Sequence, residues 1–121
     1  MADYLPRFSP GEKITLATSG AVTGGRLVIA SGAGTVAHSG ADAANVIGVA
    51  GHDADSGADV LVWTRAGGVQ ALTASAAIAA GARVISAATG KIATVGAGTN
   101  PIGIALTAAA ADGDVVDVLF V

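Results

Sequence analysis

At 121 residues and a formal net charge of −3, the chain is long enough for one domain with a single, modest core. Its six Lys and Arg residues stand singly, which excludes the basic stripe of a nucleic-acid binder, and its lack of cysteine excludes disulfides, thiolate metal sites and a cysteine nucleophile. No apolar run reaches the length of a membrane span, and the first residues lack the pattern of a signal peptide, so we expect no export signal.

The first predicted element is an extended N-terminal arm, residues 1–11. Four residues of the chain are aromatic, and two of them, Tyr4 and Phe8, lie in this arm. Disordered tails are poor in aromatic residues, whereas this segment combines them with prolines that favour an extended backbone. An extended segment loses little entropy when it docks, so we predict that the arm docks on its own barrel, on a neighbouring subunit or beside an exposed strand of another protein. The predicted contact residues are Tyr4, Leu5, Pro6, Arg7, Phe8 and Pro10.

From residue 12 to residue 121 the sequence predicts a single β domain. Short apolar segments alternate with Gly, Ser, Asp and Asn, a pattern typical of strands joined by turns. About ten strands are expected, over residues 13–18, 26–30, 34–38, 46–51, 59–64, 68–72, 82–86, 90–95, 101–106 and 114–121. Residues 66–68 and 88–90 suit tight hairpin turns. For the alanine-rich residues 73–82, a single helical turn and a loop are equally expected.

The chain also resembles itself. Residues 24–63 align with residues 81–120 at an offset of about 55 to 57 residues. The alignment places Gly48 on Gly103, and it matches the acidic turns that precede the last strand of each copy. We therefore expect an all-β fold, a compact barrel or sandwich built from two pseudo-repeats.

The strongest candidate for metal chemistry is the loop before the fifth predicted strand. It holds His52, Asp53, Asp55 and Asp59. Calcium prefers several oxygen ligands at alternating positions, and these aspartates alternate loosely. However, the loop lacks a closing glutamate, and the second copy of the repeat has no equivalent cluster. We therefore favour a surface turn whose aspartates accept local backbone hydrogen bonds over a metal site.

No other set of residues indicates catalysis or a cofactor. His38 and His52 lack cysteine partners and the HExxH spacing, so zinc is not expected, and no serine lies in a G-x-S-x-G elbow. The glycine-rich stretches at 31–36 and 95–100 fit no phosphate-binding motif, and hairpin turns are expected there. Lys91 is expected to be an ordinary solvated lysine. We therefore predict that the protein is not an enzyme and uses no cofactor or metal.

Several short phrases, in order, resemble a known family. They are PGE-x-IT before the first strand, AVTGG-x-LV, IGVA followed by DA-x-SG-x-DV-x-V, GGV-x-x-L and AI-x-AGA-x-V. Each phrase alone is a common β-turn sequence. In this order, from about Phe8 to the C-terminus, they are similar to the capsid decoration (capsid cement) proteins of tailed bacteriophages, a family once catalogued as a domain of unknown function.

The resemblance implies a structural virion protein that decorates and stabilises the outer surface of a bacteriophage capsid. It implies binding at junctions of major capsid protein subunits, assembly as a homo-oligomer with a trimer favoured, and an N-terminal arm that takes part in the contact. It also implies a compact, β-tulip-like domain that is made in the host cytoplasm. No nucleic-acid or membrane partner is expected.

A carbohydrate-binding or adhesive β module displayed on a virion also fits an all-β chain of this kind. Sugar sites usually present exposed aromatic rings. Outside the arm and the C-terminal strand, Trp63 is the one aromatic residue of the chain. This second hypothesis therefore depends on Trp63.

Overall fold

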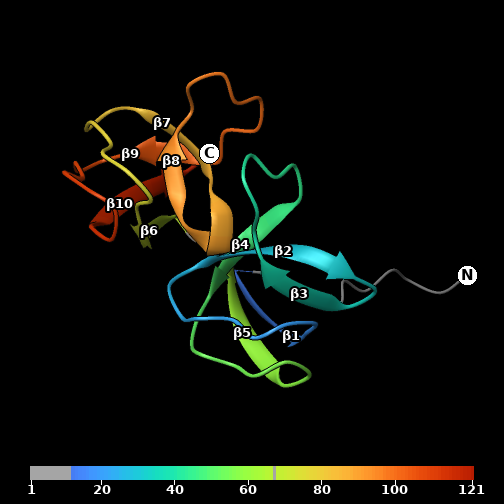
Figure 1. Cartoon of the computed structure of the whole chain (residues 1–121). Helices are drawn as coiled ribbons and strands as arrows, with labels where there is room; N and C mark the ends of the chain where they lie inside the picture. Colours follow the sequence, from blue (N-terminus) through green and yellow to red (C-terminus); the bar gives the residue numbers. More distant parts are fainter. Residues whose placement is uncertain (1–11, 67) are drawn as a thin grey trace, which may run out of the picture.

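The computed structural model describes residues 12–66 and 68–121, and these residues form ten strands in two groups of five (Figure 1). The first unit contains β1 (Lys13–Thr18), β2 (Leu27–Gly32), β3 (Thr35–His38), β4 (Val46–Ala50) and β5 (Asp59–Thr64). The second unit contains β6 (Val69–Thr73), β7 (Arg83–Ser86), β8 (Ile92–Thr94), β9 (Gly103–Ala105) and β10 (Val115–Phe120), with a short 3-10 helix, η1 (Ala88–Gly90), between β7 and β8. The predicted all-β class and the ten predicted strands are confirmed. The arm predicted over residues 1–11 lies outside the described residues.

The two units share one strand topology, as the sequence repeat predicts. The first unit is a closed barrel of order β1-β3-β2-β4-β5, in which β1 pairs with β3 in parallel and with β5 in antiparallel. The second unit has the order β6-β10-β9-β7-β8. Each of its strands has the same neighbours as the equivalent strand of the barrel, except that β6 and β8 are not joined as neighbouring strands of the sheet. An isolated parallel bridge between Ala74 and Ile92 lies at the position that corresponds to the parallel β1–β3 pair of the barrel. The second unit is therefore an incompletely closed copy of the first.

Gly48 and Gly103 occupy equivalent places in β4 and β9, and both lie against the backbone of the neighbouring strand. A Cβ atom on Gly48 would overlap the carbonyl oxygen of Trp63 on β5. A Cβ atom on Gly103 would overlap the carbonyl oxygen of Leu119 on β10. Close approach of two strands therefore explains why both copies of the repeat carry glycine at this position.

We expect Gly48→Ala and Gly103→Ala each to lower the free energy of unfolding by about 1 to 3 kcal/mol, because the added methyl group must displace a paired strand. Chemical denaturation would measure the change. Gly20→Ala is the matched control, since a Cβ atom at Gly20 meets nothing within 4 Å. If the control lost as much stability as the two strand variants, close strand approach would not be the cause.

The hydrophobic core of the second unit is completed by the outer wall of the barrel. The barrel interior holds Val22, Val28, Val36, Ala50, Val60 and Val62. Because neighbouring residues of a strand point to opposite faces, Leu27 points out of the barrel, and it pairs with Val49 across β2 and β4. Leu27 and Val49, together with Val46, belong to the same core cluster as the buried side chains of the second unit. The barrel therefore has a core of its own, and its outer wall also belongs to the core of the second unit, so the single core expected from the length of the chain is wrong.

Hydrogen bonds also join the two units through the loop that precedes β4. The Ser86 hydroxyl donates to the Gly40 carbonyl at 2.8 Å and accepts the Ala43 N–H at 2.8 Å. The Asn100 N–H donates to the Asp42 carboxylate at 2.9 Å. Backbone N–H groups of the second unit, from Thr99 first and then from Asn100, hold the pKa of Asp42 below its usual range. This contribution to stability is complete above the ordinary aspartate pKa and is lost as the pH falls below it.

Two predicted turns join paired strands, as expected. Residues 31–36 connect β2 to its antiparallel partner β3, with Gly34 at a φ of 72°. Residues 88–90 connect β7 to β8, and Thr89 and Gly90 there have φ values of 55° and 74°. For residues 73–82, the loop alternative is correct, because the described backbone contains no helical turn in that stretch.

Two other predicted hairpins are wrong. The segment after β5 does not return to β5, since β6 pairs with β10; it connects the first unit to the second. Residues 95–100 lead from β8 to β9, and these strands pair with β7 rather than with each other. Turn-forming residues mark where a strand ends, but barrel closure decides which strands pair.

Candidate functional site

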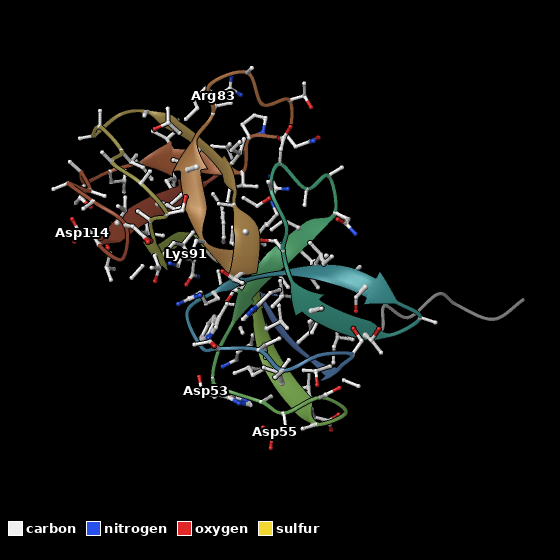
Figure 2. All side chains as sticks on the ribbon, viewed as in Figure 1. Asp53, Asp55, Arg83, Lys91 and Asp114 are labelled. Atoms are coloured by element: carbon white, nitrogen blue, oxygen red, sulfur yellow. The ribbon has the colours of Figure 1, made fainter. Side chains whose placement is uncertain are left out.

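The acidic loop of the first unit is a surface turn. Asp53 and Asp55 lie at the end of the molecule that Figure 2 shows at the bottom, and they line an open pocket of about 440 Å³ with Val22 and its neighbours. Asp53 Oδ1 accepts the N–H of Gly24, 29 residues away, at 2.8 Å, so the predicted local backbone hydrogen bond is wrong for Asp53. Across residues 12–66 and 68–121, no three His, Asp or Glu side chains gather into a group that could hold a metal ion.

Both histidines accept hydrogen bonds from the backbone. His52 Nε2 accepts the Leu61 N–H at 3.2 Å, so Nδ1 carries the proton and donates to the Asp53 carbonyl at 2.9 Å. His38 Nε2 accepts the Thr23 N–H at 2.8 Å. Partial burial, and secondly the positive charge of Arg26, lower the pKa of His38. These contacts give both rings a structural role.

We expect the stability of the protein to decrease as the pH falls through about 6.5, because His38 must be neutral to accept its hydrogen bond. The pKa of His38 is lowered in the folded state, so its contribution is complete above the pKa of unfolded histidine and is lost below it. His38→Gln keeps an acceptor atom and should flatten this dependence between about pH 7 and pH 5. Denaturation midpoints across this range would measure the effect. If the denaturation midpoint changed with pH equally in wild type and in His38→Gln, His38 would not be the cause of the dependence.

Lys91 is held in an ion pair, which corrects the prediction of an ordinary solvated lysine. Its Nζ lies 2.8 Å from Asp112 Oδ1, and its side chain is 22% exposed. The hydrogen bond and the charge of Lys91 lower the pKa of Asp112. The sequence around Lys91 has no nearby acid, because the partner comes from the distant loop before β10.

Trp63 lies on the outside of β5 and is 36% exposed. The ammonium group of Lys13 stands 5.3 Å from the centroid of the indole ring. This cation–π contact covers one face of the ring. That face of the indole is therefore not open for stacking against a sugar.

The second unit presents an exposed apolar surface. Among the described residues, five exposed large hydrophobic side chains lie on β6 and β10 or directly after β9 and β10: Val69, Leu106, Val115, Leu119 and Val121. Leu119 pairs with Val69 on one side and with Ile104 on the other, so these three residues form a row across β6, β10 and β9. We call the surface formed by Val69, Ile104, Leu106, Val115 and Leu119 the apolar face.

The sequence of β10 gives an indication of the apolar face that the prediction of strands does not use. A strand with one buried face alternates apolar and polar residues. In β10, Val116, Val118 and Phe120 are buried, but Val115 and Leu119 on the opposite side are apolar as well. Exposed apolar residues on the outer side of a strand make this surface a candidate for contact with a partner.

The residues predicted to form the contact site, Tyr4, Leu5, Pro6, Arg7, Phe8 and Pro10, all lie outside the described residues. The described chain starts at Glu12, whose carbonyl accepts the Thr64 N–H at 3.0 Å. Within the described segments, no helix is long and apolar enough to cross a membrane.

Comparison with known proteins identifies the fold and the family. No curated protein matches the sequence. The fold is similar to the crystal structure of the head fiber gp8.5 N base in bacteriophage phi29, with a TM-score of 0.72 and 19% sequence identity over 90% of this chain and 92% of that chain. At this identity the likeness shows a shared fold. A family model described as phage cement protein matches residues 8–120, nearly the whole sequence. The chain therefore belongs to the phage cement protein family.

Proposed function

We propose that this protein binds the outer surface of a bacteriophage capsid, at junctions of major capsid protein subunits, and stabilises the assembled shell. The observation that carries the proposal is the match to the phage cement family over residues 8–120, which makes the protein a structural component of a phage virion. A protein that binds the assembled lattice and not the free subunits stabilises the lattice by mass action. No catalytic step is part of this role.

The proposed contact includes the N-terminal arm. Its residues Tyr4, Leu5, Pro6, Arg7, Phe8 and Pro10 would bind the shell or the neighbouring decoration subunit. In a homo-oligomer, with a trimer as the favoured state, several arms would act together and raise the overall affinity by avidity. The exposed apolar face of the second unit supports a protein built to be covered by partners.

The structure gives little support to the carbohydrate-binding alternative. Trp63 is the one aromatic side chain on which that alternative depends, and Lys13 covers one face of its ring. A sugar would have to displace a cation–π contact before it could stack there. Capsid decoration is therefore the better-supported function.

We expect the purified protein to co-sediment with undecorated, expanded heads of its own phage and to saturate at a fixed number of copies per head. The protein alone, centrifuged under the same conditions, is the control for aggregation. Decorated heads should also withstand heating or chelation better than bare heads. If the protein stayed in the supernatant at about 10 µM, the affinity would be too weak for a cement role.

A further inference from the structure

We propose that the apolar face of one copy of the protein binds the N-terminal segment, residues 1–11, of a neighbouring copy. The inference rests on the proposed function, because it assumes that the arm makes a contact. It adds which surface the arm binds. The partner is a second copy of this chain, and the contact is made before any capsid is present.

The fold itself does not require valine at two positions of the apolar face. The first unit is an internal control, because its strands pair in the same register. Val69 begins β6 opposite β10, and its equivalent in the first unit is Lys13, opposite β5. Val115 begins β10, and its equivalent is Asp59. The barrel therefore carries charged residues at two positions where the second unit carries exposed valines, whereas the equivalent of Leu119 is the apolar Trp63. The shared strand register does not require the two valines.

The described chain starts close to one end of the apolar face. Glu12 accepts hydrogen bonds from the backbone and the hydroxyl of Thr64, at 3.0 and 3.2 Å. The next residue, Arg65, donates from Nη2 to the carbonyl of Val121 at 3.0 Å. Val121 follows β10 directly and is 61% exposed. The described chain therefore begins near the end of the apolar face at which β10 ends.

The composition of the segment complements the face. Tyr4, Leu5 and Phe8 supply large apolar side chains. Asp117 lies on the exposed side of β10 between Val115 and Leu119, and Arg7 gives the segment the opposite charge. Burial of these apolar side chains favours association, and several such contacts in one oligomer act together.

A neighbouring copy fits this arrangement better than the same copy. Eleven extended residues reach up to about 36 Å, and Pro6 and Pro10 favour an extended segment over one that folds back on its own unit. The segment and the apolar face are different surfaces, so the contact is head-to-tail. Contacts of this type close into rings when the rotation between copies allows it.

Complementation between two full-length variants tests the proposal. One variant, Tyr4→Ser/Leu5→Ser/Phe8→Ser, lacks the apolar segment but keeps the face. The other, Val69→Ser/Leu119→Ser, lacks the face but keeps the segment. By light scattering at about 100 µM we expect wild type to form an oligomer, each variant alone to be monomeric, and the equimolar mixture to form a heterodimer. Lys13→Ser, at the position equivalent to Val69, is the matched control and should assemble like wild type.

Three results would overturn the proposal: a mixture that stays monomeric, a face variant that still assembles, or a monomeric wild type. Should Val69→Ser/Leu119→Ser fail to fold, Val115→Thr replaces it, because Val115 is 61% exposed and its side chain is not part of the core. Val115→Thr should then weaken assembly at least about tenfold, and unchanged assembly would equally overturn the proposal. The measurement uses no heads, so its outcome is independent of whether the protein binds a capsid.

Discussion

Replacing Leu27 with alanine is expected to lower the free energy of unfolding by about 2 to 5 kcal/mol. Leu27 is fully buried and points out of the barrel into the core of the second unit. Its removal leaves a cavity at the place where the two units meet, and both units lose packing. Few single substitutions in this chain should lower the free energy of unfolding by more, because few side chains pack against residues of both units.

Denaturation followed by circular dichroism would measure this loss, with Leu106→Ala as the matched control. Leu106 is 50% exposed, so the same substitution there should change stability by about 1 kcal/mol or less. We propose that residues 12–121 behave as one cooperative domain. Fluorescence of Trp63, which reports on the first unit, should then change together with the signals of the second unit. A first unit that stays folded after the second has melted would contradict this cooperativity.

Removal of residues 1–10 is expected to weaken capsid binding by at least about a hundredfold while the β domain remains folded. Each buried Tyr, Leu or Phe side chain is worth about 1.5 to 3 kcal/mol, so the loss of two contacts accounts for this factor, whether the arm contacts the shell directly or joins the copies that bind the shell together. The strands start at Lys13, after the deleted segment. Circular dichroism would check the fold, and quantitative sedimentation with heads would give the affinity.

The control for this truncation is the full-length variant Asp3→Ser, which alters the same segment but keeps its apolar side chains. It should bind heads almost as well as wild type. If the truncated protein kept the affinity of wild type, the arm would have no part in capsid binding, and the apolar face would become the first candidate for the contact.

The strands of this protein could be predicted from sequence because each is a short apolar run between residues that favour turns. The segments 13–18 and 59–64 agree with β1 and β5 at both ends. Which strands pair could not be predicted, since a link such as residues 66–68 has the same turn chemistry whether it closes a hairpin or joins two units. The repeat was the better guide, because equivalent positions such as Gly48 and Gly103 have the same backbone environment.

The candidate site was predictable to a smaller extent. The ion pair of Lys91 joins residues far apart in the sequence, and no local pattern reports it. The apolar face depends on the strand order β6-β10-β9, which places Val69, Leu119 and Ile104 side by side. Periodicity shows that Val115 and Leu119 are apolar residues on the outer side of β10, but it does not show which neighbours complete the surface. The contact residues of the arm lie outside the described residues and stay a prediction.

The position of the acidic loop has a practical consequence for the use of this protein as a carrier. Asp53 and Asp55 lie at the opposite end of the molecule from Arg83 and Asp114 of the second unit (Figure 2). Ser56 and Gly57, at the tip of this loop, are exposed. A foreign peptide inserted between them would project from the end of the barrel, away from the apolar face. An antigen or enzyme fused at this point could therefore be displayed on a decorated particle without blocking the surface through which we propose that the copies assemble.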